Sequence, residues 1–224
     1  MHSHQSIDLA ALQERGWLEI PHIYRPDQLL SLATGLGPIV HQDSRPPISK
    51  LIPIPAETAG LATASRTYGT GEFPFHTDLA HWPTPARFLV MGNTGVASHT
   101  PTLLLDTRTD ATFQQLRPLA RRAVWKVSKT RRPFTCSMLF SHGDTERLRW
   151  DTNVMSPSNA AAEEIASLLP VSLRLSERAN VTSIHWHQTG RTLIVDNWRV
   201  LHARPAVPTT DSMRTLYRIF VMEE

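Results

Sequence analysis

The feature that most constrains the fold is a series of short extended segments running through the middle and C-terminal parts of the chain. They are separated by Pro, Gly, Thr and Asn residues, which favour turns. Because they do not alternate regularly with helices, a doubly wound parallel sheet is disfavoured, and a sandwich or closed barrel is expected. The expected strands are 17–20, 50–54, 86–92, 102–106, 123–129, 147–151, 181–188, 191–196, 199–203 and 214–222.

A few helices should flank these strands. Residues 8–15 should form a short helix closed by Gly16. A second helix should follow Pro26 and end near Gly35-Leu36-Gly37-Pro38, in agreement with the usual placement of Pro and Gly at helix ends. Two more are expected near 110–119 and 158–169, the latter capped by Ser158 or Asn159. The predicted class is mainly β with flanking helices (α+β). With no repeat or linker, residues 1–224 should form a single domain.

Composition limits the location and the kind of metal site. No apolar run approaches the roughly 20 residues of a membrane span, and the N-terminal segment lacks the apolar core of a signal peptide. We therefore expect a cytoplasmic protein with no membrane partner. The single cysteine, Cys136, excludes an internal disulfide and a cysteine-rich metal site, so a metal would need nitrogen and oxygen ligands.

Charge is uneven along the chain. The net charge is only +3, but six basic residues fall within 121–132. A solvated strand and turn is the plainest interpretation. An anion clamp or a nucleic-acid surface is also open, although few aromatic residues lie there to stack on bases.

Three His-x-Asp triplets are candidate metal motifs. Two residues spaced this way on an extended segment face the same side and can reach one ion. With 11 His and 20 acidic residues such triplets arise by chance, and only His76-Thr-Asp78 follows an extended aromatic run and precedes an apolar strand. The triplets at His41 and His142 look like loop and turn, and the His185-Trp-His187 pair fits an ordinary strand face.

The third ligand is expected far downstream, at His202 in VDNWRVLHARPA. Two histidines and one carboxylate leave three adjacent positions open on octahedral iron(II), two for a chelating 2-oxo acid and one for dioxygen.

Arginines near the C-terminus could bind the distal carboxylate of such an acid. The segment RTLYR places Arg214, Leu216 and Arg218 on one face of an expected strand. An inward-facing arginine is costly unless it meets an anion, and the guanidinium fork matches a carboxylate. A solvent-facing surface, or pairing with protein acids, remains open.

Together these segments resemble the taurine dioxygenase and clavaminate synthase-like family of iron(II)/2-oxoglutarate oxygenases. The matching segments are FPFHTDLAHWPTPARFLVMG, HTPTLLLD, VDNWRVLHARPA and RTLYRIF, spanning about residues 70–222. The resemblance implies a double-stranded β-helix (jelly-roll, cupin-like) core, iron(II) on His76, Asp78 and His202, and 2-oxoglutarate and dioxygen as co-substrates. The implied partners of 2-oxoglutarate are Thr102, Arg214 and Arg218, the last near its chelating end or near an anionic substrate.

The resemblance further implies hydroxylation, or else desaturation or cyclisation, of a small polar molecule such as an amino acid or specialised metabolite. Succinate and CO2 would be released. Asp78 disfavours halogenation, since halogenating relatives lack this carboxylate.

One departure from the family pattern is His99-Thr-Pro-Thr102 in place of Gly-Gly-Asp-Thr. Asn197 should shape the turn before the distal histidine.

Two alternatives stay open. One is a nucleic-acid oxidative demethylase using the basic stretch, which the motifs fit less well. The other is a jelly-roll binding module without catalysis. The sequence makes no prediction of oligomeric state.

Overall fold

The computed structural model describes residues 7–41, 46–61, 63–128, 130, 132–142, 145–174 and 180–223. The described helices are α1 (Leu9–Arg15), α2 (Pro26–Thr34), α3 (Ala64–Tyr68), α4 (Ala111–Arg122), α5 (Ala160–Ser172) and a 3-10 turn at Thr209–Asp211. The described strands are β1 (Trp17–Ile20), β2 (Ser49–Leu51), β3 (Phe73–His76), β4 (Phe88–Asn93), β5 (Ser98–Asp106), β6 (Val124–Val127), β7 (Phe134–Ser137), β8 (Leu139–His142), β9 (Thr145–Leu148), β10 (Met155–Pro157), β11 (Thr182–Trp186), β12 (Arg191–Asp196), β13 (Val200–Arg204) and β14 (Leu216–Val221).

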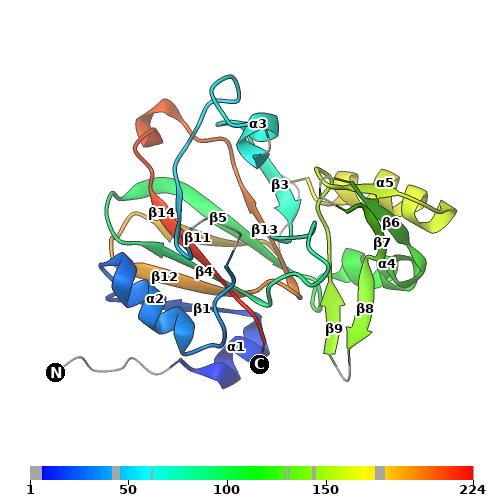
Figure 1. Ribbon diagram of the computed structural model, residues 1–224, viewed down its shortest axis with the longest axis horizontal. Coiled ribbons are helices and arrows are strands. Elements are labelled where there is room, and N and C mark those ends of the chain that lie inside the picture. Colours follow the sequence, from blue (N-terminus) through cyan, green and yellow to red (C-terminus); the bar gives the residue numbers. More distant parts are fainter. Residues whose placement is uncertain are drawn as a thin grey trace.

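Two antiparallel sheets form the centre of the molecule (Figure 1). The first sheet has the strand order β1-β12-β4-β14-β2, and the second has the order β11-β5-β13-β3. Their facing sides share one apolar core, to which β4, β12 and β14 contribute from the first sheet and β5, β11 and β13 from the second. Side chains alternate along each strand, so in β4 Leu89 and Met91 enter this core while Phe88 and Val90 face the opposite side.

Helices α1 and α2 cover the outer side of the first sheet. Helix α1 is capped by Asp8, which accepts a hydrogen bond from the amide of Ala11, and it ends at Gly16 in the left-handed conformation with φ of 82°. Leu12 of α1 and Leu29 of α2 pack against the outer face of β4, β12 and β14. The sequence prediction of both helices is confirmed.

A second layer covers the outer side of the second sheet. It consists of α4, α5, the three-stranded sheet β10-β6-β7 and the β8–β9 hairpin, on the right of Figure 1. Helix α4 is capped by Asp110 and helix α5 by Asn159, the second of the two cap residues expected. Phe113 and Ile165 from these helices pack onto Leu103 and Leu201 of the second sheet.

Several boundaries differ from the sequence prediction. The segment 214–222 was expected to be extended from its first residue, but β14 begins at Leu216, so Arg214 lies before the strand rather than on one of its faces. The region 55–72, for which no helix or strand was predicted, contains α3. The extended runs of β7, β8 and β10 were not predicted. No helix in the described ranges combines the length and apolarity needed to cross a membrane.

Candidate metal centre

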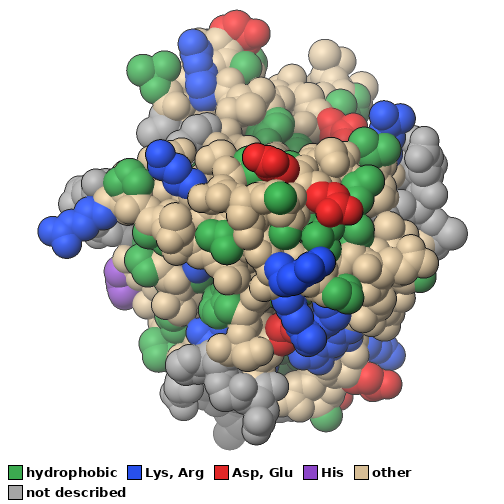
Figure 2. Space-filling model, turned by 90° about the vertical axis from the view of Figure 1, so that its right-hand side faces the viewer, with side chains coloured by type: hydrophobic (Ala, Val, Ile, Leu, Met, Phe, Trp, Pro, Cys, Tyr) green, Lys and Arg blue, Asp and Glu red, His purple; other side chains and the backbone are tan. Residues whose placement is uncertain are grey.

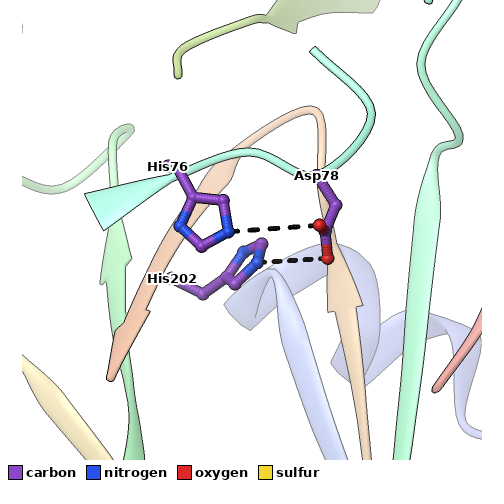
Figure 3. Close-up of side chains that lie close together, drawn as sticks. All are labelled: His76, Asp78 and His202. Atoms are coloured by element: carbon purple, nitrogen blue, oxygen red, sulfur yellow. Dashed lines mark ion pairs between the residues drawn. The ribbon is translucent and has the colours of Figure 1, made fainter. Parts of the chain in front are cut away.

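The two histidines of the predicted triad lie opposite each other on neighbouring strands. His76 ends β3, and His202 on β13 is its direct antiparallel partner. Asp78 follows two residues after His76, and potential ligand atoms of all three residues lie within 4.8 Å of one another (Figure 3). The Nε2 atom of His76 is 4.0 Å and that of His202 3.4 Å from the Asp78 carboxylate. Within the ranges that the structure describes, this is the one cluster of three or more such groups that could hold a metal ion.

His76 is prepared to act as a neutral ligand. Its Nδ1 atom lies 2.9 Å from the carbonyl oxygen of Pro74, a contact that places the proton on Nδ1 and leaves the Nε2 lone pair facing Asp78. Burial, followed by repulsion from His202, lowers the pKa of His76 to about 3. The ring is therefore uncharged at neutral pH, as metal coordination requires.

Asp78 is held as a carboxylate. Burial alone would raise the pKa of Asp78, but the charge of Arg218 and the hydrogen bond from His202 hold it well below its usual range. Arg218 Nη1 lies 3.1 Å and 3.2 Å from the two carboxylate oxygens. Arg218, predicted to lie near the chelating end of a co-substrate, is thus hydrogen-bonded to Asp78, the acid of the triad.

The backbone of the triad is fixed from two sides. The amide of Thr77 donates to the carbonyl of Trp150 at 2.7 Å, and the Thr77 hydroxyl accepts from the Trp150 amide at 3.0 Å. On the other side the Asn197 side chain accepts from the Asp78 amide at 2.8 Å and donates to the Asp78 carbonyl at 3.0 Å. Asn197, expected only to shape a turn, therefore positions a candidate ligand.

Arg149 is a positioning residue that the sequence did not reveal. Its buried guanidinium donates to the carbonyl oxygens of Ala80, Trp82 and Pro83, which follow Asp78 directly. The sequence placed Arg149 only within the expected strand 147–151, and its partners lie 66 to 69 residues away in sequence. Such long-range partners cannot be read from local spacing.

Thr102 and Arg214 are the residues predicted to bind the distal carboxylate, and both are buried. The buried Thr102 hydroxyl accepts a hydrogen bond from the Trp186 indole at 3.0 Å, which leaves its own proton free to donate. Arg214 is only 6% exposed, and its Nε atom has no hydrogen-bond partner among the described residues. Burial, with a contribution from the charge of Arg204, lowers the pKa of Arg214 to about 10, so the side chain stays protonated at neutral pH.

The acid that acts on Arg214 is already occupied. Asp211 accepts hydrogen bonds from the Ser98 hydroxyl, the His99 amide, and both the amide and the hydroxyl of Thr100. These bonds tie the unusual His99-Thr-Pro-Thr102 segment, which begins β5 rather than forming a turn, to the 3-10 turn before Arg214. No ion pair joins Arg214 to an acid within the described ranges, so its charge is available to a ligand.

The other histidine motifs are not brought to this centre. His185 and His187 are exposed on and just after β11, with ring centroids 6.0 Å apart. The acids of the other two triplets, Asp43 and Asp144, lie outside the described residues.

The basic stretch is partly neutralised. Arg121 binds Glu146 at 2.8 Å, and Arg117 pairs with the same acid, while Lys129 and Arg131 lie outside the described residues. Figure 2 views the molecule from the side of α4 and α5 and shows Lys and Arg side chains interspersed with acidic and hydrophobic ones.

Comparison with known proteins gives structural neighbours only. No family model matches the chain. No curated protein sequence matches it either. An asparagine oxygenase solved with Fe(II), 3-hydroxyasparagine and succinate is similar with a TM-score of 0.71 at 17% identity, over 96% of this chain and 78% of that one. The non-heme iron oxygenase OrfP, solved with Fe and alpha-ketoglutaric acid, has a TM-score of 0.71 at 16% identity, over 96% and 77%. PvcB from Pseudomonas aeruginosa has a TM-score of 0.65 at 18% identity, over 95% and 78%. At these identities, the likeness shows that the chain has the fold of non-heme iron oxygenases.

Proposed function

We propose that this protein is an iron(II)- and 2-oxoglutarate-dependent oxygenase. The observation that carries the proposal is the convergence of His76, Asp78 and His202 on one point inside the fold. Two imidazoles and one carboxylate are the donor set of non-heme iron oxygenases, and they leave adjacent coordination positions open. Bound iron(II) would let dioxygen and 2-oxoglutarate react to give succinate and CO2, with one oxygen atom passing to the substrate.

The co-substrate would extend from the metal towards Thr102 and Arg214. The unpaired guanidinium of Arg214 would bind the distal carboxylate, and the Thr102 hydroxyl, oriented by Trp186, would donate to the same group. Arg218 would hold Asp78 in place and lie beside the chelating end of the acid. A neutral pocket could not select a dicarboxylate, which is why the unpaired charge supports this assignment.

The fold and substrate class belong to the same proposal. The two facing sheets are proposed to form a double-stranded β-helix within a single domain, 1–224, located in the cytoplasm. The structural neighbours were solved with hydroxylated asparagine and arginine, which supports a small amino-acid-like substrate and hydroxylation as the outcome. Arg117 and Arg121 on α4 form ion pairs with Glu146, so their charges give little support to a nucleic-acid substrate or another anionic polymer.

Formation of succinate tests the proposal. The purified protein, loaded with iron(II), would be incubated with 2-oxoglutarate and a panel of free amino acids under air. We expect substrate-stimulated succinate release that stops in His202→Ala and continues in His185→Ala, a matched control that removes an exposed histidine outside the centre. Absence of succinate across the panel, or release that persists in His202→Ala, would contradict the proposal and favour a binding module.

A further inference from the structure

A second arginine beside Arg214 has a buried nitrogen without a partner. Arg204 lies on β13 two residues after His202, and alternation along the strand places both on the side facing the first sheet. Its Nη2 atom donates to the carbonyl oxygens of Gly69 and Gly71 at 3.1 Å and 2.8 Å. Its Nη1 atom is buried and has no hydrogen-bond partner among the described residues. Half of this guanidinium is therefore committed to the protein and half is free.

Arg204 and Arg214 are close enough to repel each other. The charge of Arg204 destabilises the protonated form of Arg214, and the described ranges contain no ion pair of either residue with an acid. Asp211, which opposes this effect at Arg214, has its oxygens occupied by Ser98, His99 and Thr100. Arg214 is buried, and the half-buried Arg204 has its Nη1 atom buried. Two like charges whose buried N–H groups lack partners are costly unless an anion lies between them.

We propose that Arg204 and Arg214 together bind the distal carboxylate of the co-substrate. When the carboxylate is bound, Arg204 would also hold the turn before β3 more rigidly. The inference rests on the proposed function and deepens it. One carboxylate oxygen would meet Arg214 and the Thr102 hydroxyl, and the other would meet Nη1 of Arg204. Along β5 and β13 the register pairs Leu103 with Ala203, so the next position brings Thr102 and Arg204 to neighbouring places.

The link to the metal centre runs through the turn that Arg204 holds. Gly69 and Gly71 precede β3, whose first residue, Phe73, stacks on His76 with ring centroids 4.0 Å apart. Tyr68 at the end of α3 packs on Phe73 in turn, at 4.6 Å. An anion that fixes Arg204 would thus stiffen the turn that leads to His76, although neither the anion-binding group nor the turn is itself a metal ligand.

Comparison of two acids separates this role from a structural one. The protein loaded with redox-inert zinc(II) would be titrated calorimetrically with 2-oxoglutarate and with 2-oxobutanoate, which has the same chelating end but no distal carboxylate. In Arg204→Met we expect affinity for 2-oxoglutarate to fall about tenfold to hundredfold, as for loss of a charge-assisted hydrogen bond, and affinity for 2-oxobutanoate to stay within about twofold. Arg66→Met is the matched control, because Arg66 also donates to two backbone carbonyls, those of Ala56 and Glu57, but is exposed.

The outcomes are distinct. Equal loss for both acids, or no loss, in Arg204→Met would overturn the inference while leaving the proposed function intact. If the unsubstituted protein bound both acids equally, the assignment of Arg214 and the inference would fail together.

Hydrogen exchange gives a second measurement: 2-oxoglutarate should slow exchange around Gly71 in the unsubstituted protein and not in the variant. If Arg204→Met does not fold, Arg204→Lys serves instead, since an ammonium cannot span both partners, and its selective loss should be about tenfold.

Discussion

Replacement of Asn197 by alanine should weaken metal binding although Asn197 is not itself a ligand. The fully buried side chain makes three hydrogen bonds: it accepts from the Asp78 amide and donates to the carbonyls of Asp78 and Ala86. Alanine removes all three and leaves buried backbone groups unpaired. At about 1 kcal/mol for each hydrogen bond, the free energy of unfolding should fall by about 3 kcal/mol.

The effect on the metal follows from what those bonds hold. Without Asn197 the amide and carbonyl of Asp78 lose their side-chain partner, and the backbone is restrained through the neighbouring Thr77, bound to Trp150, and through the bonds of Arg149 further along. The carboxylate would then sample orientations that do not meet both histidines. Loss of a group that orients a metal ligand typically lowers metal affinity tenfold to hundredfold, and we expect a loss of that size.

A second buried asparagine supplies the control. Asn93, at the end of β4, is equally buried and also makes three hydrogen bonds outside the metal centre: it donates to the carbonyls of Trp186 and Gln188 and accepts from the amide of Gly95. Asn93→Ala should lower the free energy of unfolding by about 3 kcal/mol on the same estimate and leave metal affinity unchanged. Stability would be measured by urea denaturation and metal affinity by competition titration. Equal metal affinity in the Asn197 and Asn93 variants would refute the positioning argument.

Three further predictions address the site and its support. His202→Ala should abolish stoichiometric binding of one divalent metal ion, measured by elemental analysis after dialysis, since it removes one of three ligands; full retention would exclude the proposed centre. Arg214→Met should raise the KM for 2-oxoglutarate about tenfold to hundredfold with a smaller change in kcat, and an unchanged KM would contradict its role. Although burial opposes it, hydrogen bonds led by that of Thr100 lower the pKa of Asp211 to about 2. Because the folded pKa lies below the unfolded value of about 3.9, this stabilisation is present above pH 4 and is lost as the pH falls through 2. Asp211→Asn should therefore cost on the order of 2 kcal/mol at pH 6 and much less at pH 2 in denaturation curves, and a pH-independent difference would contradict the argument.

The sequence was sufficient wherever the signal is local. Caps such as Asp8 and Asn159 act on amides three residues away, so the helices they begin could be predicted within a residue or two. Strand periodicity likewise predicted that His76 and Asp78 lie close enough to share an ion. The choice of His202 rested on the downstream segment VDNWRVLHARPA and on the resemblance to known oxygenases, because a pairing between distant strands has no local signature.

The sequence was insufficient wherever partners come from distant segments. The short strands β7, β8 and β10 were missed since they are ordered by pairing and by packing on the second sheet rather than by their own pattern. Arg214 was placed on a strand face because the even spacing of RTLYR was extended beyond the point where pairing starts, at Leu216. Strand boundaries depend on the neighbour as much as on the strand.

The amino-acid sequence by itself determined the residue types, the turns and caps, and the short-range pairing of His76 with Asp78. Only the tertiary structure decided that His202 faces His76 and that Asn197 and Trp150 hold the segment Thr77–Asp78. It also decided that Arg204 acts on Arg214 while, among the described residues, neither forms an ion pair with an acid. The physical reason is the register of antiparallel strands, which brings together residues more than a hundred positions apart. Register is selected by the burial of whole strand faces, a property of the complete core rather than of any one segment.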